Sequence, residues 1–217
     1  MADHRARIVP KGKDLDRIFG PSQGGNTDIN ILQPIKDTGG LVFPYTPIIS
    51  AAGGAANYQD HHFTHSNYRT WSYQNTQSNE ITISGKFTAQ TEIEARYMLA
   101  VIHFCKSMTK SQYGIKAGNK AGLPPPIFHF NYLGTYQYNN VPVVITTYAH
   151  ELMDDIDYVP VKFGDNDTDT TYVPTIMTLT LTLAIQPNPR TLMNEFNLDT
   201  FKTGALLRDR GNKSGFL

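Results

Sequence analysis

The chain has 217 residues and no formal net charge; 18% of its residues are charged and 40% are hydrophobic. This length allows one domain with a sizeable core, or one domain with long extensions. The zero net charge gives no global basic excess of the kind that points to nucleic acid. The low share of charged residues, with Thr, Asn, Gln and Tyr in their place, favours sheets and protein contacts over a highly charged enzyme surface.

Neither a secretory leader nor a membrane span is expected. The stretch from Met1 to Asp14 lacks the apolar run of a signal peptide, and no apolar run in the chain approaches the roughly 20 residues of a membrane span. Cys105 is the single cysteine, so no intrachain disulfide can form. We therefore expect a protein that folds in a reducing cytoplasm and makes no membrane contact.

Residues 1–40 are expected to form an extended N-terminal arm. They are rich in Gly, Asp, Asn and Lys and carry few apolar anchors, so the arm gains little from folding alone and would become ordered on a neighbouring subunit. The ordered domain is expected to span residues 41–186. It begins with residues 41–49, where Pro44 and Pro47 predict an edge strand or an extended entry segment.

Two adjacent segments are predicted to pair as a hairpin. Residues 68–74 and residues 80–88 alternate with a period of two, and the polar residues 75–79 between them are typical of a turn. The first segment carries three aromatic residues: Tyr68, Trp71 and Tyr73. They could stack on sugars, as in a carbohydrate-binding β-sandwich, or on bases. Packing against the core or a partner chain is the favoured interpretation.

Residues 92–109 are predicted to form a well-buried helix. Thr91 lies three residues before Glu94, which is the spacing of a capping box. Apolar residues then recur every three or four positions from Ile93 to Met108 and share one face.

Three further strands are predicted at residues 127–133, 141–151 and 174–186, with an acidic loop at 164–171 and a C-terminal arm at 187–217. The last strand has the clearest alternation in the chain. Its apolar face holds Met177, Leu179, Leu181, Leu183 and Ile185. Its polar face holds Thr178, Thr180 and Thr182. We expect the apolar face to line the core and the threonine face to be wet or to pair with a subunit.

A histidine-rich segment is the most suggestive candidate for chemistry. His61, His62 and His65 follow Asp60, and such side chains can bind zinc or a first-row metal, as in a metal-dependent hydrolase. Adjacent residues on a strand point in opposite directions, however, so His61 and His62 would diverge. A polar loop is the favoured interpretation, and no catalytic residue, metal site or cofactor is predicted.

Several short segments follow one another in a recognisable order. They are EITISGKF at 80–87, EARYMLAVIHF at 94–104, the pair Tyr113-Gly114, GLPPP at 122–126, NVPVVI at 140–145, DIDYV at 155–159 and VPTIMT at 173–178. This succession, over roughly residues 65–205, resembles the tail-tube and baseplate hub proteins of contractile-tailed bacteriophages. The resemblance rests on the order of strands and helix and on sequence character.

The resemblance implies an α+β fold that is mainly antiparallel: a tail-tube-like two-sheet sandwich or partly closed barrel with one flanking helix and long terminal arms. It implies a non-enzymatic virion protein of the tail baseplate, assembled in the host cytoplasm. Six copies would form a ring that caps or initiates the tail tube and lets DNA pass without sequence-specific binding. Neighbouring tube, hub and wedge proteins would be its partners. The expected interface residues are Tyr68, Trp71, Tyr73, Thr178, Thr180 and Thr182.

Overall fold

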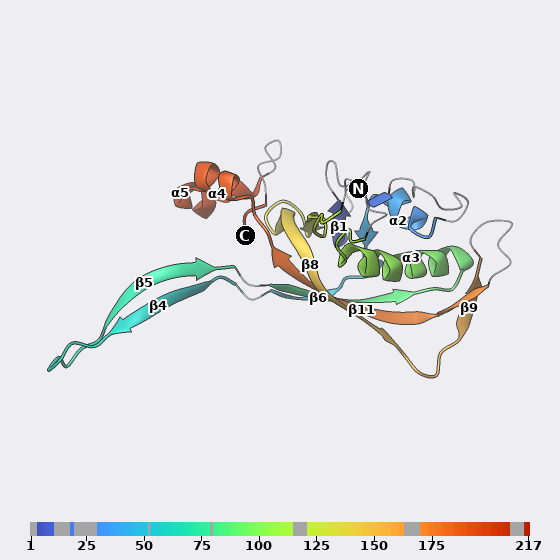
Figure 1. Ribbon diagram of the computed structural model, residues 1–217, viewed down its shortest axis with the longest axis horizontal. Helices are drawn as coiled ribbons and strands as arrows, with labels where there is room; N and C mark the ends of the chain where they lie inside the picture. Colours follow the sequence, from blue (N-terminus) through green and yellow to red (C-terminus); the bar gives the residue numbers. More distant parts are fainter. Residues whose placement is uncertain are drawn as a thin grey trace.

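The three-dimensional structure is a computed structural model that describes residues 4–10, 18–19, 30–51, 53–78, 80–114, 121–162, 170–208 and 215–217. A large antiparallel sheet carries a long helix on one face, and a two-stranded ribbon projects from one end (Figure 1). The predicted α+β class with mainly antiparallel strands is confirmed. Among the described helices, none is long and apolar enough to span a bilayer.

The large sheet has seven strands in the order β2-β1-β7-β8-β11-β6-β3. Their bounds are β2 (Leu41–Val42), β1 (Arg7–Pro10), β7 (Phe128–Tyr132), β8 (Tyr138–Leu152), β11 (Ile176–Ile185), β6 (Ile81–Thr88) and β3 (Ile48–Ala51). The order ends at β2 and β3, which do not pair with each other, so the sheet is not closed into a barrel.

Two small sheets and several helices complete the described part of the chain. The small sheets pair β4 (Ala55–His61) with β5 (Thr70–Gln77) and β9 (Tyr158–Val161) with β10 (Thr171–Pro174). The helices are α2 (Gln33–Asp37), α3 (Glu92–Met108), α4 (Pro189–Glu195) and α5 (Leu198–Lys202), followed by the 3₁₀ turn η2 (Ala205–Leu207).

Strand β11 lies inside the sheet and supplies much of the core. It pairs with β6 on one side and β8 on the other. Met177, Leu179, Leu181 and Leu183 are fully buried, as the period-two pattern predicts. The predicted strand at 174–186 therefore corresponds closely to β11, although Pro174 itself ends β10.

Helix α3 confirms the predicted helix and its first turn. Thr91 Oγ1 accepts the backbone N–H of Glu94, and the Glu94 side chain accepts the backbone N–H of Thr91, so the capping box is complete. The helix ends at Met108 with Thr109 as C-cap. Cys105 is buried on its inner face, and burial raises the pKa of this thiol to about 12.

The predicted hairpin between residues 68–74 and 80–88 is wrong. Strand β5 pairs with β4, whereas β6 pairs with β3 and β11. Because β5 continues to Gln77, residues 75–77 of the expected turn instead extend the strand, and β6 runs in the same direction as β5 (Figure 1). The alternation of residues 68–74 predicts a strand correctly, but the partner of that strand is β4, which lies earlier in the sequence.

The boundary expected at residue 40 does not separate an arm from the domain. β1 is inserted between β2 and β7, and Ala6 and Ile8 are fully buried. These residues therefore belong to the core of their own chain, while residues 1–3, 11–17 and 20–29 lie outside the described part. Most of the expected acidic loop, at 163–169, also lies outside it. In the C-terminal segment, Asn139 Nδ2 donates to the carbonyl of Leu207 at 2.9 Å.

Candidate functional site

The ribbon formed by β4 and β5, residues 55–77, is the most exposed element of regular structure. Every residue of β5 is exposed, and the ribbon projects away from the sheet and α3 (Figure 1). Within residues 55–77 only Asp60 and Arg69 carry full charges at neutral pH. An isolated two-stranded ribbon is marginal in water, so this element has the character of a surface that another chain completes.

The register divides the ribbon into two chemically different faces. Residues opposite each other, and alternate residues along one strand, share a face. The pairs Tyr58–Tyr73 and Asp60–Trp71 therefore form an aromatic face. The opposite, polar face holds Gln59, His61, Thr70, Ser72 and Gln74. Side-chain hydrogen bonds hold this polar face together, including Gln74 to Gln59 at 2.8 Å.

The aromatic face does not form a flat stacking platform. The Tyr58 and Tyr73 rings meet edge to face, with centroids 5.7 Å apart and planes at 70°. Trp71 is 60% exposed on the same face, and Tyr68 lies beyond the strand in the tip loop. The exposed edge-to-face arrangement is suited to packing into a hollow in a partner protein.

The three histidines at the ribbon tip are not brought together. His61 Nε2 lies 2.8 Å from Ser72 Oγ on the polar face, whereas His62 Nε2 lies 3.0 Å from Asp60 Oδ2. His65 has a positive φ of 61° in the tip loop. Among the residues that the structure describes, no group of three His, Cys, Asp or Glu side chains is placed to hold a metal ion. The arrangement gives the metal-hydrolase alternative no ligand set there.

The threonine face of β11 forms a second candidate surface, separate from the ribbon. Thr178, Thr180 and Thr182 are partly exposed, on the face opposite their fully buried neighbours. The register continues this face onto β6 through Lys86, Ser84 and Thr82 and onto β8 through Glu151, Ala149 and Thr147. Thr180 donates a hydrogen bond to Ser84 Oγ at 3.2 Å. The result is a band of small hydroxyl and methyl groups, with the opposite charges of Lys86 and Glu151 on either side of Thr178.

The edges of the large sheet and of the ribbon differ in their protection. β2 has two residues and β3 has four, and Pro44 and Pro47 lie between them, so the sheet's edges are short and interrupted. β4 and β5 have seven and eight residues without a proline. Long, proline-free, weakly charged edges are the kind that pair with other chains.

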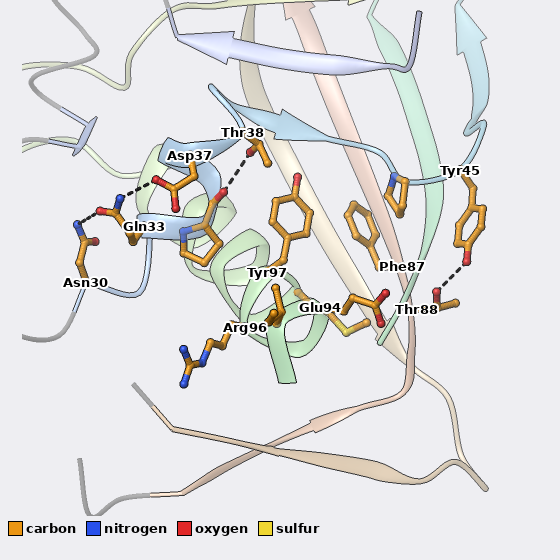
Figure 2. A pocket seen from close by; sticks show the side chains of 14 residues that line it. Asn30, Gln33, Asp37, Thr38, Tyr45, Phe87, Thr88, Glu94, Arg96 and Tyr97 are labelled. Carbon is orange, nitrogen blue, oxygen red and sulfur yellow. Dashed lines mark hydrogen bonds between the residues drawn. The ribbon is translucent and has the colours of Figure 1, made fainter. Parts of the chain in front are cut away.

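A groove is lined by residues of α2 and the start of α3 (Figure 2), and these elements lie toward the other end of the molecule from the ribbon (Figure 1). It has a volume of about 830 Å³ and lies between α2, the start of α3, the β2–β3 connection and the end of β6. The apolar lining comes from Pro34, Pro44, Phe87, Ile93 and Met98. This volume falls within the range of sites that take a ligand or a partner's side chains.

Hydrogen bonds fix the wall of the groove. The Tyr97 hydroxyl donates to the carbonyl of Val42 at 2.9 Å and accepts its N–H at 2.8 Å, and burial raises the pKa of Tyr97. Tyr45 and Thr88 hydroxyls are hydrogen-bonded at 2.9 Å across the groove's far side. Hydrogen bonds within the chain therefore hold the wall in place. Ile93, beside this wall, is 78% exposed.

Charged side chains lie around the groove. Backbone N–H groups of Gln90 and then Thr91 bind the Glu94 carboxylate and lower its pKa, so this group stays anionic. Asp37 Oδ1 accepts a hydrogen bond from Gln33 at 2.7 Å. Arg96 pairs with Glu92 at 2.8 Å. Of the buried side-chain nitrogen and oxygen atoms in the described residues, the Arg96 Nε lacks a hydrogen-bond partner.

Sequence reasoning identified some of these features and missed others. Trp71 and Tyr73 do share one exposed face, and the three β11 threonines do share another, but the structure places these two sets on separate surfaces. Sequence reasoning missed β4, because its last residues, Asp60 and His61, were expected to belong to a polar loop. The groove was missed because its lining comes from four separate segments. The alternation of Asn57, Gln59 and His61 with Tyr58 and Asp60 was the available signal for β4.

Comparison with known proteins adds no relative from which a function could be transferred. A scan of the sequence against protein-family models gives no match, and a search of curated proteins gives none either.

Proposed function

We propose that this chain is a structural subunit of a phage tail baseplate, and that copies of it form a ring that caps or initiates the tail tube. The observation that carries this proposal is the exposed ribbon, residues 55–77, which extends from the sheet without a covering partner in the described part of its own chain (Figure 1). Such a ribbon gains stability when another chain covers its aromatic face.

The open sheet supports the same function. A sheet that covers one face with α3 and leaves the other lined by Thr178, Thr180 and Thr182 has one dry and one wet side. In a ring, the wet side would face the central passage. Hydroxyl and methyl groups there offer DNA no dense array of positive charge, so the duplex would pass without being held. The resemblance of residues 65–205 to tail-tube and hub proteins supplies the expectation of six copies.

The proposed role requires no chemistry from the chain. Its contributions are shape, a wet inner surface and contacts to neighbouring tube, hub and wedge proteins. No catalytic residue, metal or cofactor is assigned, and the phage particle is the proposed location.

Two measurements test the proposal. Mass spectrometry and antibody labelling of purified tailed particles should find this chain at the junction of tube and baseplate. Electron microscopy of the concentrated protein, alone and with its neighbouring tail proteins, should reveal rings with a central channel. Absence of the chain from the particles, together with no ring under either condition, would refute the proposed function.

A further inference from the structure

We propose that the aromatic face of the ribbon in one copy docks in the groove of a second copy. This inference rests on the proposed ring-forming function and names the surface that receives the ribbon. The contact joins two different surfaces, so each copy offers a ribbon at one end and a groove at the other. Such a head-to-tail contact closes into a ring when the rotation from one copy to the next closes after a whole number of copies.

The position of the two surfaces supports a contact between copies. The ribbon and the groove lie toward opposite ends of the molecule's long axis (Figure 1). Both are left open by the described part of their own chain: Trp71 is exposed on one, and Ile93 on the other. A fixed groove wall and a protruding aromatic face are the two halves of a typical interface hot spot.

The chemistry of the two surfaces is complementary. The apolar lining of the groove that is open to a partner, which includes Pro34, Pro44 and Ile93, is suited to the rings of Tyr58, Trp71 and Tyr73.

The charges also match in pairs. The ribbon carries Asp60 and Arg69, whose charged atoms are 3.9 Å apart and therefore only loosely paired. The groove offers the Asp37 and Glu94 carboxylates to Arg69. It offers the Arg96 guanidinium, whose side chain is 39% exposed, to Asp60. Charge pairs of this kind orient a contact and reject the reversed arrangement.

Mixing two variants that are each defective in one surface tests the head-to-tail contact. The ribbon variant carries Trp71→Ser and Tyr73→Ser, and the groove variant carries Ile93→Glu. Each alone should be a monomer in sedimentation experiments, because each lacks one half of the contact. Their equimolar mixture should form a heterodimer that cannot grow, since the ribbon of the groove variant meets the intact groove of the ribbon variant.

Matched controls use exposed apolar side chains away from both surfaces. Tyr113→Ser, at a residue 96% exposed, and Met193→Glu, at a residue 86% exposed, should assemble as the wild type does. Within the heterodimer, Asp60→Lys in the ribbon-donating copy should weaken the affinity by about fivefold. Arg96→Glu in the groove-donating copy should then restore much of that loss.

The outcomes separate this inference from the proposed function. If the wild type forms rings but the mixture stays monomeric, the ribbon–groove contact is refuted and the ring stands. Ribbons that pair with each other would refute the contact by a different result, because the groove variant alone, whose ribbon is intact, would then associate. If the wild type stays monomeric up to about 1 mM and is also missing from tailed particles, both proposals fail. If it is monomeric in solution but present in particles, the contact is refuted as a self-sufficient interface.

Discussion

The body of the molecule, which is the large sheet with α3, and the ribbon, residues 55–77, differ in how far their side chains are buried. In the body, β11 buries Met177, Leu179, Leu181 and Leu183 completely against α3 and the neighbouring strands. In the ribbon, β5 buries no residue, and large aromatic side chains remain in contact with water. The body therefore obtains its stability from its own chain, whereas the ribbon gains little from the described part of that chain. One sequence thus contains a part that buries its apolar side chains and a part that leaves large aromatic side chains in contact with water.

The largest expected change in the free energy of unfolding comes from a substitution in the core of the body. Leu181→Ala removes a fully buried side chain from the middle of β11. The transfer and cavity contributions together should lower the free energy of unfolding by about 2–5 kcal/mol. Urea denaturation followed by circular dichroism measures this loss. A loss below about 1 kcal/mol would mean that the core is not the source of the body's stability.

The next effect tests how tightly the body is packed. Gly85 lies in β6, and a Cβ added there would come within 2.5 Å of the buried Phe43 ring. Phe43 also packs on Phe87 at a centroid distance of 5.5 Å, so its ring has little room to move. We expect Gly85→Ala to lower the free energy of unfolding by about 1–3 kcal/mol. Gly53→Ala, where a Cβ would meet no atom within 4 Å, is the matched control in the same assay.

A smaller effect tests the capping box of α3. Thr91→Ala removes the oxygen that accepts the Glu94 N–H and should cost about 1 kcal/mol. Glu94→Gln should act differently with pH. Its carboxylate has a lowered pKa in the folded state, so the stability it contributes is present above the unfolded pKa and is lost as pH falls through the folded value. The gap between wild type and Glu94→Gln should therefore shrink between pH 7 and pH 3; a gap independent of pH would contradict the assigned interaction.

The smallest change in the free energy of unfolding of the monomer is expected from a substitution in the ribbon. Trp71→Ser removes the largest exposed side chain of the aromatic face, yet the free energy of unfolding of the monomer should change by less than about 0.5 kcal/mol. Thermal unfolding of dilute protein measures this. The same variant should impair assembly. A loss of several kcal/mol in the monomer would show that the ribbon belongs to the folding unit, and the contrast with the body would disappear.

The sequence by itself determined the elements whose signals are local. The capping box and the spacing of apolar residues placed α3, since both depend on residues within a few positions of each other. Alternation placed β11 and assigned its two faces, and the prolines at 44 and 47 indicated an edge. The aromatic and threonine surfaces were likewise visible as runs of alternate residues.

Only the tertiary structure decided which strands pair and where surfaces meet. Alternation predicts a strand over residues 68–74, but β4, β3 and β11 all present the same backbone hydrogen-bonding groups, so the choice of partner depends on the whole fold. The same reason explains why β1 joins the sheet from within an expected arm. The groove depends on four segments that are distant in sequence, and its unpartnered Arg96 nitrogen becomes visible only when those segments are packed together.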